Sequence, residues 1–367
     1  MKILHIGNLK SGIDTYVRNT IANISNDFEF VIVNGADDES MPYIRNGAIV
    51  RSYSICMYRQ LNPLKDFKAL IQAVKIIKKE KPDIIHCHSA KGGVIGRVAG
   101  FLTRCKTAYT AHAFSFLSAE SPRKRSLYLI LEKVTRLKSW LIACSKSEQR
   151  LGTTEVGYKK CKALEWANSI NNVDDAENIA DLPSDRYVCS IGRPSYQKNP
   201  LLMVEVARIV HQSYDDVKFM MLGTGFYSPL LANMKNKIVE YGLEDVFILK
   251  PWLNHKEAMG YLKSSSVFLT NSIYEGLPIA VLEAMSLGKA IVATDVIGNN
   301  DCLLDGESGL LTDMNAEEIA NKIILILSDS NLRMRIGMGA RQAFETNFLI
   351  TNRIKKLEEI YKAITAN

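Results

Sequence analysis

Short β-branched apolar runs alternate with amphipathic stretches along the first half of the chain. The apolar runs are KILHIG, FEFVIVNG, DIIHCH, TAYTAHA and WLIACS. The stretches between them predict helices from about Ile13, over Pro63–Lys79, near Val94–Leu102 and near Lys124–Lys138. This alternation predicts a parallel sheet covered by helices, which is one doubly wound α/β unit.

A second series of the same kind begins after a polar stretch. Its apolar runs are YVCSIG, VKFMMLG, VFILKP, VFLTNS and AIVATD, with helices predicted from Leu201, up to about Tyr241 and from Pro278. Residues 171–184, NNVDDAENIADLPS, have no apolar periodicity and indicate a linker. The series therefore predicts a second Rossmann-like unit.

The pattern divides the chain of 367 residues into two domains, a number that suits its length. We expect domains over residues 1–175 and 176–348, with 349–367 a helix that packs back on the first domain. Open α/β sheets bind ligands at the carboxyl ends of their strands. The expected fold class is therefore α/β, with two Rossmann-like doubly wound domains facing a central cleft.

Composition excludes several classes of protein. Apolar residues make up 47% and charged residues 23%, which is typical of a globular chain. The longest apolar clusters, LYLIL and IILIL, are far shorter than the roughly 18 residues of a membrane span. The start, MKILHIGN, lacks the features of a signal peptide, so we expect a cytoplasmic protein.

No metal site is expected. At least 16 residues lie between any two of the seven cysteines, which excludes a CxxC pair. His86, Cys87 and His88 are consecutive in a strand, where neighbours alternate faces, so only the two histidines share a face. Structural zinc takes four ligands, which two histidines do not supply.

Charge is unevenly distributed along the chain. Residues 1–181 contain 27 Lys and Arg against 18 Asp and Glu, a balance of +9, whereas the remainder has a balance of −2. This asymmetry indicates a basic first half that faces a phosphate-bearing or acidic partner. Ordinary solvated lysines are the alternative.

The most informative segment is EGLPIAVLE, which starts at Glu275 and follows the strand VFLTNS. Pro278 suits the first position of a helix, where a missing N–H costs nothing. The free N–H groups near Ile279 and Ala280 then form an anion site at the helix N-terminus. Glu275 and Glu283 flank this site with carboxylates that accept hydrogen bonds from sugar hydroxyls. A pair of surface glutamates around a core helix is the alternative.

Two cations follow the first strand of the second domain. Arg193 and Lys198 lie in SIGRPSYQKNP, in a turn at the carboxyl end of that strand. A guanidinium and an ammonium there could neutralise a departing diphosphate. Two surface charges on a loop are the alternative.

With these motifs the chain resembles a retaining glycosyltransferase of the GT-B fold, family 4, over nearly its whole length. The hallmark is two glutamates separated by seven residues, matched by Glu275 and Glu283 in EGLPIAVLEAMSLGKAIVATD. GRPSYQKN, LGTG and SGLL also match. The resemblance implies a nucleotide diphosphate sugar as donor. It also implies that the N-terminal domain binds the acceptor and the C-terminal domain binds the nucleotide sugar.

The resemblance also implies roles for individual residues. Arg193 and Lys198 hold the diphosphate, Glu275 the donor sugar and Glu283 the ribose. Further donor-binding residues are Gly12, Gly276, Leu277, Pro278 and Ile279. Gly12 belongs to the first strand-to-helix turn, where Ser11-Gly12 replaces the usual Gly-Gly. His112 in TAHAFSF matches the active-site histidine that reaches the donor sugar, although a lone histidine at a strand end is more often structural.

Two segments of the first domain suggest the acceptor side. HSAKGGVIGR resembles enzymes that build bacterial surface polysaccharides, with Lys91 and Gly92 opening a helix beside the cleft as a site for an acceptor phosphate. Glycines for close packing at a helix start are the alternative. Arg123, Lys124 and Arg125 begin a basic, leucine-rich stretch that suits docking on an anionic membrane. A core helix with solvated basic ends is the alternative.

We therefore expect a retaining hexosyl- or N-acetylhexosaminyltransferase of bacterial surface polysaccharide biosynthesis, capsule included. Its donor is UDP-linked, or GDP-linked as second choice, and its acceptor is a lipid-linked saccharide at the inner face of the cell membrane. No cofactor and no nucleic acid is expected. No metal is expected either, since no Asp-x-Asp motif occurs. The alternatives are a sugar-nucleotide epimerase of related fold and a non-catalytic partner subunit. A nicotinamide dehydrogenase is weaker, because GNLKSG lacks GxGxxG spacing.

Overall fold

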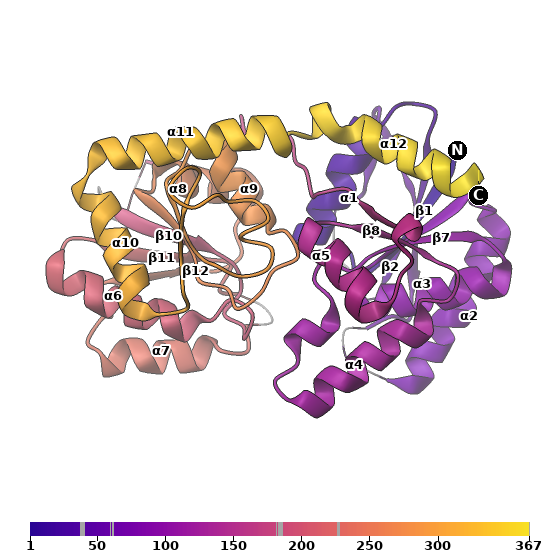
Figure 1. Ribbon diagram of the computed structural model, residues 1–367, viewed down its shortest axis with the longest axis horizontal. Helices are drawn as coiled ribbons and strands as arrows, with labels where there is room; N and C mark the ends of the chain where they lie inside the picture. Colours follow the sequence, from indigo (N-terminus) through magenta and orange to yellow (C-terminus); the bar gives the residue numbers. More distant parts are fainter. Residues whose placement is uncertain are drawn as a thin grey trace. The chain divides into compact units, whose positions relative to one another are not determined.

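The chain forms two compact units, each an α/β structure around its own parallel sheet (Figure 1). Unit 1 comprises Met1–Asn171 and Ile350–Asn367, and unit 2 comprises Asn172–Leu349. The predicted α/β class with two doubly wound sheets is confirmed. The computed structural model describes residues 1–36, 41–58, 60, 62–180, 182, 186–225 and 228–366.

In the described residues, the sheet of unit 1 has seven parallel strands. Their spatial order is β5 (Arg51–Ile55), β2 (Glu29–Gly35), β1 (Lys2–Gly7), β6 (Ile84–His88), β7 (Lys106–Thr110), β8 (Trp140–Ala143) and β9 (Ala163–Glu165). Because all strands are parallel, their carboxyl ends lie along one edge. A separate two-stranded pair consists of β3 (Ile44–Arg45) and β4 (Ala48–Ile49).

Helices cover both faces of this sheet. One apolar cluster joins Ile3 of β1 to α1 (Gly12–Asn23) and α12 (Ile350–Ala366). The neighbouring Leu4 faces the opposite side, in a cluster with α2 (Pro63–Glu80) and α3 (Ser89–Thr103). The remaining helices of unit 1 are α4 (Pro122–Thr135), α5 (Lys146–Leu151) and the short η1 (Ser115–Ser118), η2 (Gly152–Val156) and η3 (Lys160–Lys162).

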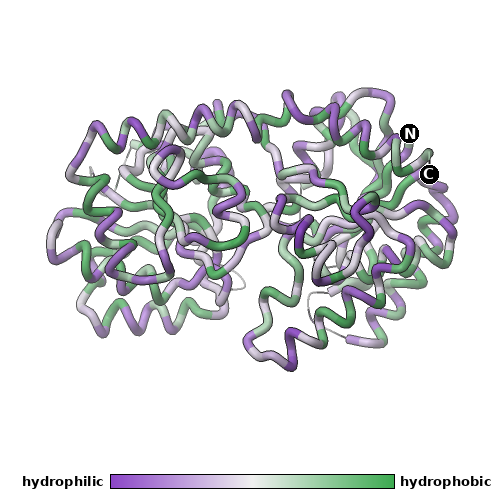
Figure 2. The backbone as a smooth tube through the Cα atoms, viewed as in Figure 1, coloured by the Kyte–Doolittle hydropathy of each residue, from purple (hydrophilic) through white to green (hydrophobic). Residues whose placement is uncertain are grey.

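The sheet of unit 2 has six parallel strands in the described residues. Their spatial order is β12 (Phe247–Lys250), β11 (Lys218–Leu222), β10 (Tyr187–Ile191), β13 (Val267–Thr270), β14 (Ile291–Thr294) and β15 (Leu310–Thr312). Most of these strand residues are apolar (Figure 2), and most are buried, as strands covered on both faces require.

The helices of unit 2 complete its core. Residues of α6, α7 and α10 pack against Val188, Met221 and Val292 of the sheet, while α9 contacts β14 and α11. The bounds of these helices are α6 (Pro200–Ser213), α7 (Leu231–Glu240), α8 (His255–Ser264), α9 (Ile279–Ser286), α10 (Ala316–Ser328) and α11 (Ser330–Asn347).

The structure bears on two expected segments, the C-terminal helix and the linker. The C-terminal region contains two helices, α11 and α12, which are interrupted at Phe348 and Leu349, and the helix expected over residues 349–367 is α12. Residues 171–180 form no helix or strand, as expected of the linker, whereas its residues 181, 183 and 184 lie outside the described part of the chain. Among the described helices, none combines the length and the hydropathy needed to cross a bilayer.

Candidate active site

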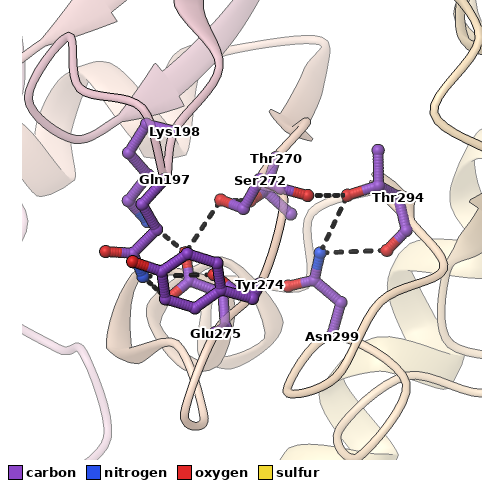
Figure 3. Close-up of polar contacts among 8 residues, drawn as sticks. All are labelled: Gln197, Lys198, Thr270, Ser272, Tyr274, Glu275, Thr294 and Asn299. Carbon is purple, nitrogen blue, oxygen red and sulfur yellow. Dashed lines mark hydrogen bonds and ion pairs between the residues drawn. The ribbon is translucent and has the colours of Figure 1, made fainter. Parts of the chain in front are cut away.

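Lys198 and Glu275 meet at the carboxyl ends of two neighbouring strands of unit 2 (Figure 3). Lys198 lies in the turn between β10 and α6, and Glu275 lies in the loop between β13 and α9. Lys198 Nζ donates to Glu275 Oε1 over 2.7 Å. Two residues that the sequence analysis selected independently therefore form one ion pair.

The carboxylate of Glu275 is held from several sides. Only 6% of the residue is exposed. Ser272 Oγ donates to Oε1 over 2.8 Å, and Gln197 Nε2 donates to Oε2 over 2.9 Å. A buried carboxylate is costly unless it is paired and hydrogen-bonded, and these contacts meet that requirement. The carboxylate is therefore fixed in an orientation set by three side chains.

The loop that carries Glu275 is itself braced by β14 and the turn that follows it (Figure 3). Thr294 Oγ1 donates to the carbonyl of Ser272 over 2.6 Å, and Asn299 Nδ2 donates to the carbonyl of Thr294 over 3.0 Å. Gly298 has φ of 91°, and a Cβ there would lie 2.5 Å from Glu275 Cβ. Only glycine permits this close approach.

The same loop leads into the N-terminus of α9. The helix begins at Ile279, one residue after Pro278. The first N–H groups of a helix, here those of Ile279 and Ala280, have no intrahelical acceptor and attract anions. Both residues are half-buried. The preceding loop residues named by the sequence analysis are buried: Gly276, Leu277 and Pro278.

Glu283 lies one turn further along α9 and is also buried. Its Oε1 accepts a hydrogen bond from His255 Nε2, at the start of α8, over 2.9 Å. This hydrogen bond raises the pKa of His255 above its usual value. His255 was not among the predicted site residues, because α8 follows a different strand and no sequence spacing connects it to Glu283.

Arg193 lies in the same turn as Lys198 and is half-buried. Gly192 precedes it with φ of 153°, and a Cβ there would lie 2.9 Å from Lys198 Cε. The glycine thus leaves room for the Lys198 side chain to lie over the turn. Both expected cations are therefore carried by one turn at the carboxyl end of β10.

In unit 1, His112 follows β7 in an unusual backbone conformation. His112 and Ala113 have φ of 51° and 82°, which residues other than glycine rarely adopt. The buried Glu148 holds this turn, since its Oε2 accepts from the N–H of Ala113 over 2.9 Å and its Oε1 from that of Cys144 over 3.1 Å. Sequence reasoning missed Glu148.

The ring of His112 is half-buried. Burial lowers the pKa of His112 to about 3, so the imidazole is neutral at neutral pH. The ring of Tyr16, on α1, packs edge-on against it with the ring centroids 5.0 Å apart. Gly12 is exposed at the start of this same helix, after the carboxyl end of β1.

Lys91 and Gly92 lie in the first turn of α3. Lys91 Nζ donates to Asp66 Oδ1 over 2.8 Å, so its charge is already paired. A Cβ on Gly92 would lie 2.6 Å from the Cα of Gly7 in β1. Close helix-to-strand packing therefore requires a glycine here, which was the alternative to an acceptor site.

Three buried histidines, His5, His86 and His88, place ring nitrogens within 4.8 Å of one another in unit 1. His86 already bonds Tyr361 Oη through Nδ1 (2.7 Å) and Thr110 Oγ1 through Nε2 (2.8 Å). His5 Nδ1 and His88 Nε2 are 2.8 Å apart, a hydrogen bond that occupies both atoms. The group is therefore poorly suited to hold a metal ion.

Helix α4 exposes an apolar stripe at helical spacing. Leu127, Ile130, Leu131 and Val134 are 42–67% exposed, while Glu132 and Thr135 face the core. Basic residues start the helix and are also exposed: Arg123, Lys124 and Arg125. The stripe of α4 therefore faces away from the core of unit 1, unlike that of a core helix.

Comparisons with known proteins cover nearly the whole chain. The family described as glycosyl transferases group 1 matches residues 174–343, and that described as glycosyltransferase family 4 matches residues 10–172. An Escherichia coli protein named UDP-Gal:alpha-D-GlcNAc-diphosphoundecaprenol alpha-1,3-galactosyltransferase is 29% identical over 87% of this chain and 85% of its own. The Staphylococcus aureus capsular polysaccharide biosynthesis glycosyltransferase CapM is 23% identical over 84% of each chain.

Solved structures share the fold. Sucrose-phosphate synthase from Thermosynechococcus elongatus has a TM-score of 0.84 at 18% identity and covers 100% of this chain and 99% of its own. The Anabaena protein HepE, solved in complex with UDP and glucose, has a TM-score of 0.81 at 18% identity and covers 99% and 100%. These likenesses show a fold of two parallel α/β sheets of the GT-B type.

Proposed function

Because the chain belongs to the group 1, family 4 glycosyltransferases of the GT-B fold, we propose that it moves a sugar from a UDP-linked donor to a hydroxyl of a lipid-linked saccharide. The product belongs to capsular or O-antigen-type surface polysaccharide, and the anomeric configuration is retained. The names of the relatives support the donor and the acceptor class. The single observation that carries the proposal is the Lys198–Glu275 ion pair beside the N-terminus of α9.

The reaction breaks the bond between the anomeric carbon and the diphosphate oxygen, which leaves negative charge on the diphosphate. Arg193 and Lys198 stabilise that charge together with the N–H groups that begin α9 at Ile279. Preorganised donors of this kind can supply several kcal/mol to a transition state. The chain's own cations thus take the part that a metal plays elsewhere, in keeping with the lack of an Asp-x-Asp motif.

Three further side chains orient the donor. Glu275 accepts hydrogen bonds from the hydroxyls of the donor sugar: a carboxylate has about four lone-pair sites, and three side chains occupy only part of them. Glu283 accepts from the ribose hydroxyls. His112 contacts a sugar hydroxyl near the reacting carbon. The acceptor oxygen bonds to the anomeric carbon, and its proton passes to the departing phosphate.

Unit 1 binds the acceptor in this proposal. Lys91 and Gly92 contact an acceptor phosphate, with Lys91 exchanging its partner Asp66 for that phosphate. The exposed stripe of α4 and its basic start bring unit 1 to the cytoplasmic face of an anionic membrane. The protein is then peripheral, and the lipid-linked acceptor remains in the bilayer.

The test is donor turnover by the purified chain, with and without excess chelator. Slow release of UDP from UDP-galactose without acceptor, and fast release with a lipid-diphosphate-linked sugar, are expected, both unchanged by chelator. Conversion of the donor sugar without UDP release would instead indicate an epimerase, and no turnover with any donor would indicate a non-catalytic subunit. Loss of activity with chelator, restored by magnesium or manganese, would refute metal independence.

A further inference from the structure

A chain of three imidazoles connects the core of unit 1 to His112. His5 Nδ1 lies 2.8 Å from His88 Nε2, and His88 Nδ1 lies 3.1 Å from His112 Nε2. His5 and His88 have no exposed surface, whereas His112 is partly exposed. This chain of histidines therefore starts in the apolar core and ends at the residue proposed to contact the donor sugar.

The strand register explains why these rings meet. β1 and β6 are parallel neighbours in which His5 is paired with His86. His88 is two residues further along β6, so its side chain is on the same face. His88 in turn is paired with Thr110 at the end of β7, two residues before His112.

All three rings are neutral at neutral pH. Burial lowers the pKa of His5 and of His112 to about 3, and that of His88 well below its usual value. A neutral imidazole has one N–H and one nitrogen lone pair. Each N···N contact needs one of each, so the three protons must all point along the chain in the same direction.

Only two arrangements satisfy this condition, and they differ at the ends. In the first, each Nδ1–H donates outward: from His5 to His88, from His88 to His112, and from His112 to the site. In the second, the protons are on Nε2, and His5 Nε2–H points into the core. His5 Nε2 is buried and has no hydrogen-bond partner among the described residues. A buried N–H without an acceptor is costly, and among backbone groups an orphaned N–H is rarer than an oxygen with an unused lone pair, so the first arrangement is favoured.

We propose that His88 and His5 are positioning residues that fix the tautomer of His112, so that its Nδ1 carries the proton and donates to a hydroxyl oxygen of the donor sugar. The identity of that acceptor atom rests on the proposed function, whereas the tautomer does not. Because Nε2 of His112 faces His88, Nδ1 is the ring nitrogen left for a ligand. Glu148 contributes by holding the strained turn in which the ring is presented.

The direct test is nitrogen NMR of the full chain labelled with ¹⁵N-histidine. Couplings from the carbon-bound ring protons identify the protonated nitrogen, and only six histidines need assignment. His211→Gln and His255→Gln remove the two histidine signals of unit 2. The expected result is the Nδ1–H tautomer for His5, His88 and His112. The Nε2–H tautomer at His112 in the wild-type protein would overturn the proposal.

Substitution of His88 separates positioning from packing. The amide nitrogen of Asn occupies about the place of an imidazole Nδ1, so His88→Asn keeps a donor toward His112, whereas His88→Leu removes it. His86→Asn is the matched control, since His86 is on the same strand and face as His88 but is not one of the three histidines bonded in series. We expect His88→Leu to give mixed tautomers at His112 and at least a tenfold lower kcat, with both effects largely reversed in His88→Asn. An unchanged tautomer at His112 in His88→Leu would contradict the proposal.

Ligand titration distinguishes this inference from the proposed function. UDP alone should leave the His112 nitrogen shifts unchanged, whereas UDP-galactose should shift Nδ1. If the free protein has the expected tautomers but turns over no donor, the function fails and the histidine chain stands. If donor is turned over while His112 is the Nε2–H tautomer, the function stands and the histidine chain fails.

Discussion

Lys198 and Glu275 each have a partner in the free protein that they must share with the donor. Lys198→Ala removes a cation from the diphosphate, and Glu275→Gln removes the charge that accepts from sugar hydroxyls. Loss of one preorganised group at a reacting centre can cost about 2.7–4 kcal/mol. We expect each variant to lower the rate of transfer well over tenfold while the protein remains folded, as measured by UDP release and by circular dichroism.

Unit 2 offers a matched control for Lys198→Ala. Lys237 of α7 forms an ion pair with Glu205 of α6, away from the β10 turn. Lys237→Ala thus removes the same type of side chain and breaks the same type of pair, and a partly exposed surface pair contributes only about 1 kcal/mol. Activity should be unchanged. If Lys237→Ala and Lys198→Ala were equally active, Lys198 would have no role in transfer.

Glu283 is expected to act on binding and not on the chemical step. Hydrogen bonds to a charged group contribute about 1.5–3 kcal/mol, so Glu283→Gln should weaken UDP binding by about tenfold or more. The loss should disappear with 2′,3′-dideoxy-UDP, which lacks the ribose hydroxyls. Isothermal titration calorimetry with both nucleotides measures this. Equal weakening of both would mean that Glu283 does not contact the ribose.

The sequence named the charged residues of the candidate site but not the residues that hold them. Glu275 and Lys198 stand out because they follow apolar strands at motif spacing. Gln197 and His255 do not, because each of their contacts joins segments that follow different strands. Ser272 lies only three residues before Glu275, but no local pattern shows that its hydroxyl turns toward the carboxylate. Whether a polar side chain turns toward a particular loop depends on the tertiary arrangement, which no local pattern encodes.

At the scale of elements, α4 provides a test of membrane docking. Each Lys or Arg near an anionic surface contributes about 1 kcal/mol to the free energy of membrane binding. The triple variant Arg123→Glu, Lys124→Glu and Arg125→Glu should therefore abolish binding to anionic liposomes. Sedimentation at low and high salt measures this, with neutral liposomes as reference. The charge-matched control replaces the exposed Lys68, Lys75 and Lys78 of α2 by Glu. If the wild-type protein ignores anionic liposomes at low salt, the docking proposal is wrong.

Helix ends were predictable where local chemistry defines them. α2 begins at Pro63 after Asn62, whose side chain accepts from the N–H of Lys65, and both residue types are typical of a helix start. The break between α11 and α12 has no such signal, since Phe348 and Leu349 are neither Gly nor Pro. There Ile350 N donates to the carbonyl of Ile170, a residue distant in sequence, over 2.9 Å. A tertiary contact of this kind is invisible in the pattern of the chain.

At the scale of the whole molecule, the two units differ in how they respond to acid. Unit 1 holds four histidines whose pKa values burial lowers: the fully buried His5, His86 and His88, and the half-buried His112. In the unfolded chain their pKa is about 6.5, so below this pH the unfolded state binds protons that the folded state does not. The free energy of unfolding is therefore not reduced by these histidines above about pH 6.5. Below that pH it falls by up to about 1.4 kcal/mol per pH unit for each histidine.

Other groups do not cancel this trend. Burial raises the pKa of Glu148, so protonation of this one residue of unit 1 stabilises the folded state as the pH falls. In unit 2, the hydrogen bond to Glu283 raises the pKa of His255, so His255 stabilises unit 2 below that pKa and ceases to do so as the pH rises through it. Unit 1 should therefore lose stability first as the pH falls from about 7 toward 5.

The tryptophans allow each unit to be followed separately. Trp140 and Trp166 belong to unit 1, and Trp252 belongs to unit 2. In Trp252→Phe, fluorescence reports on unit 1, and we expect the urea midpoint to decrease strongly between pH 7.5 and pH 5. In the double variant Trp140→Phe and Trp166→Phe, fluorescence reports on unit 2, and the midpoint should change little. Equal decreases for both reporters, or a larger decrease for unit 2, would contradict the assignment of acid sensitivity to the buried histidines.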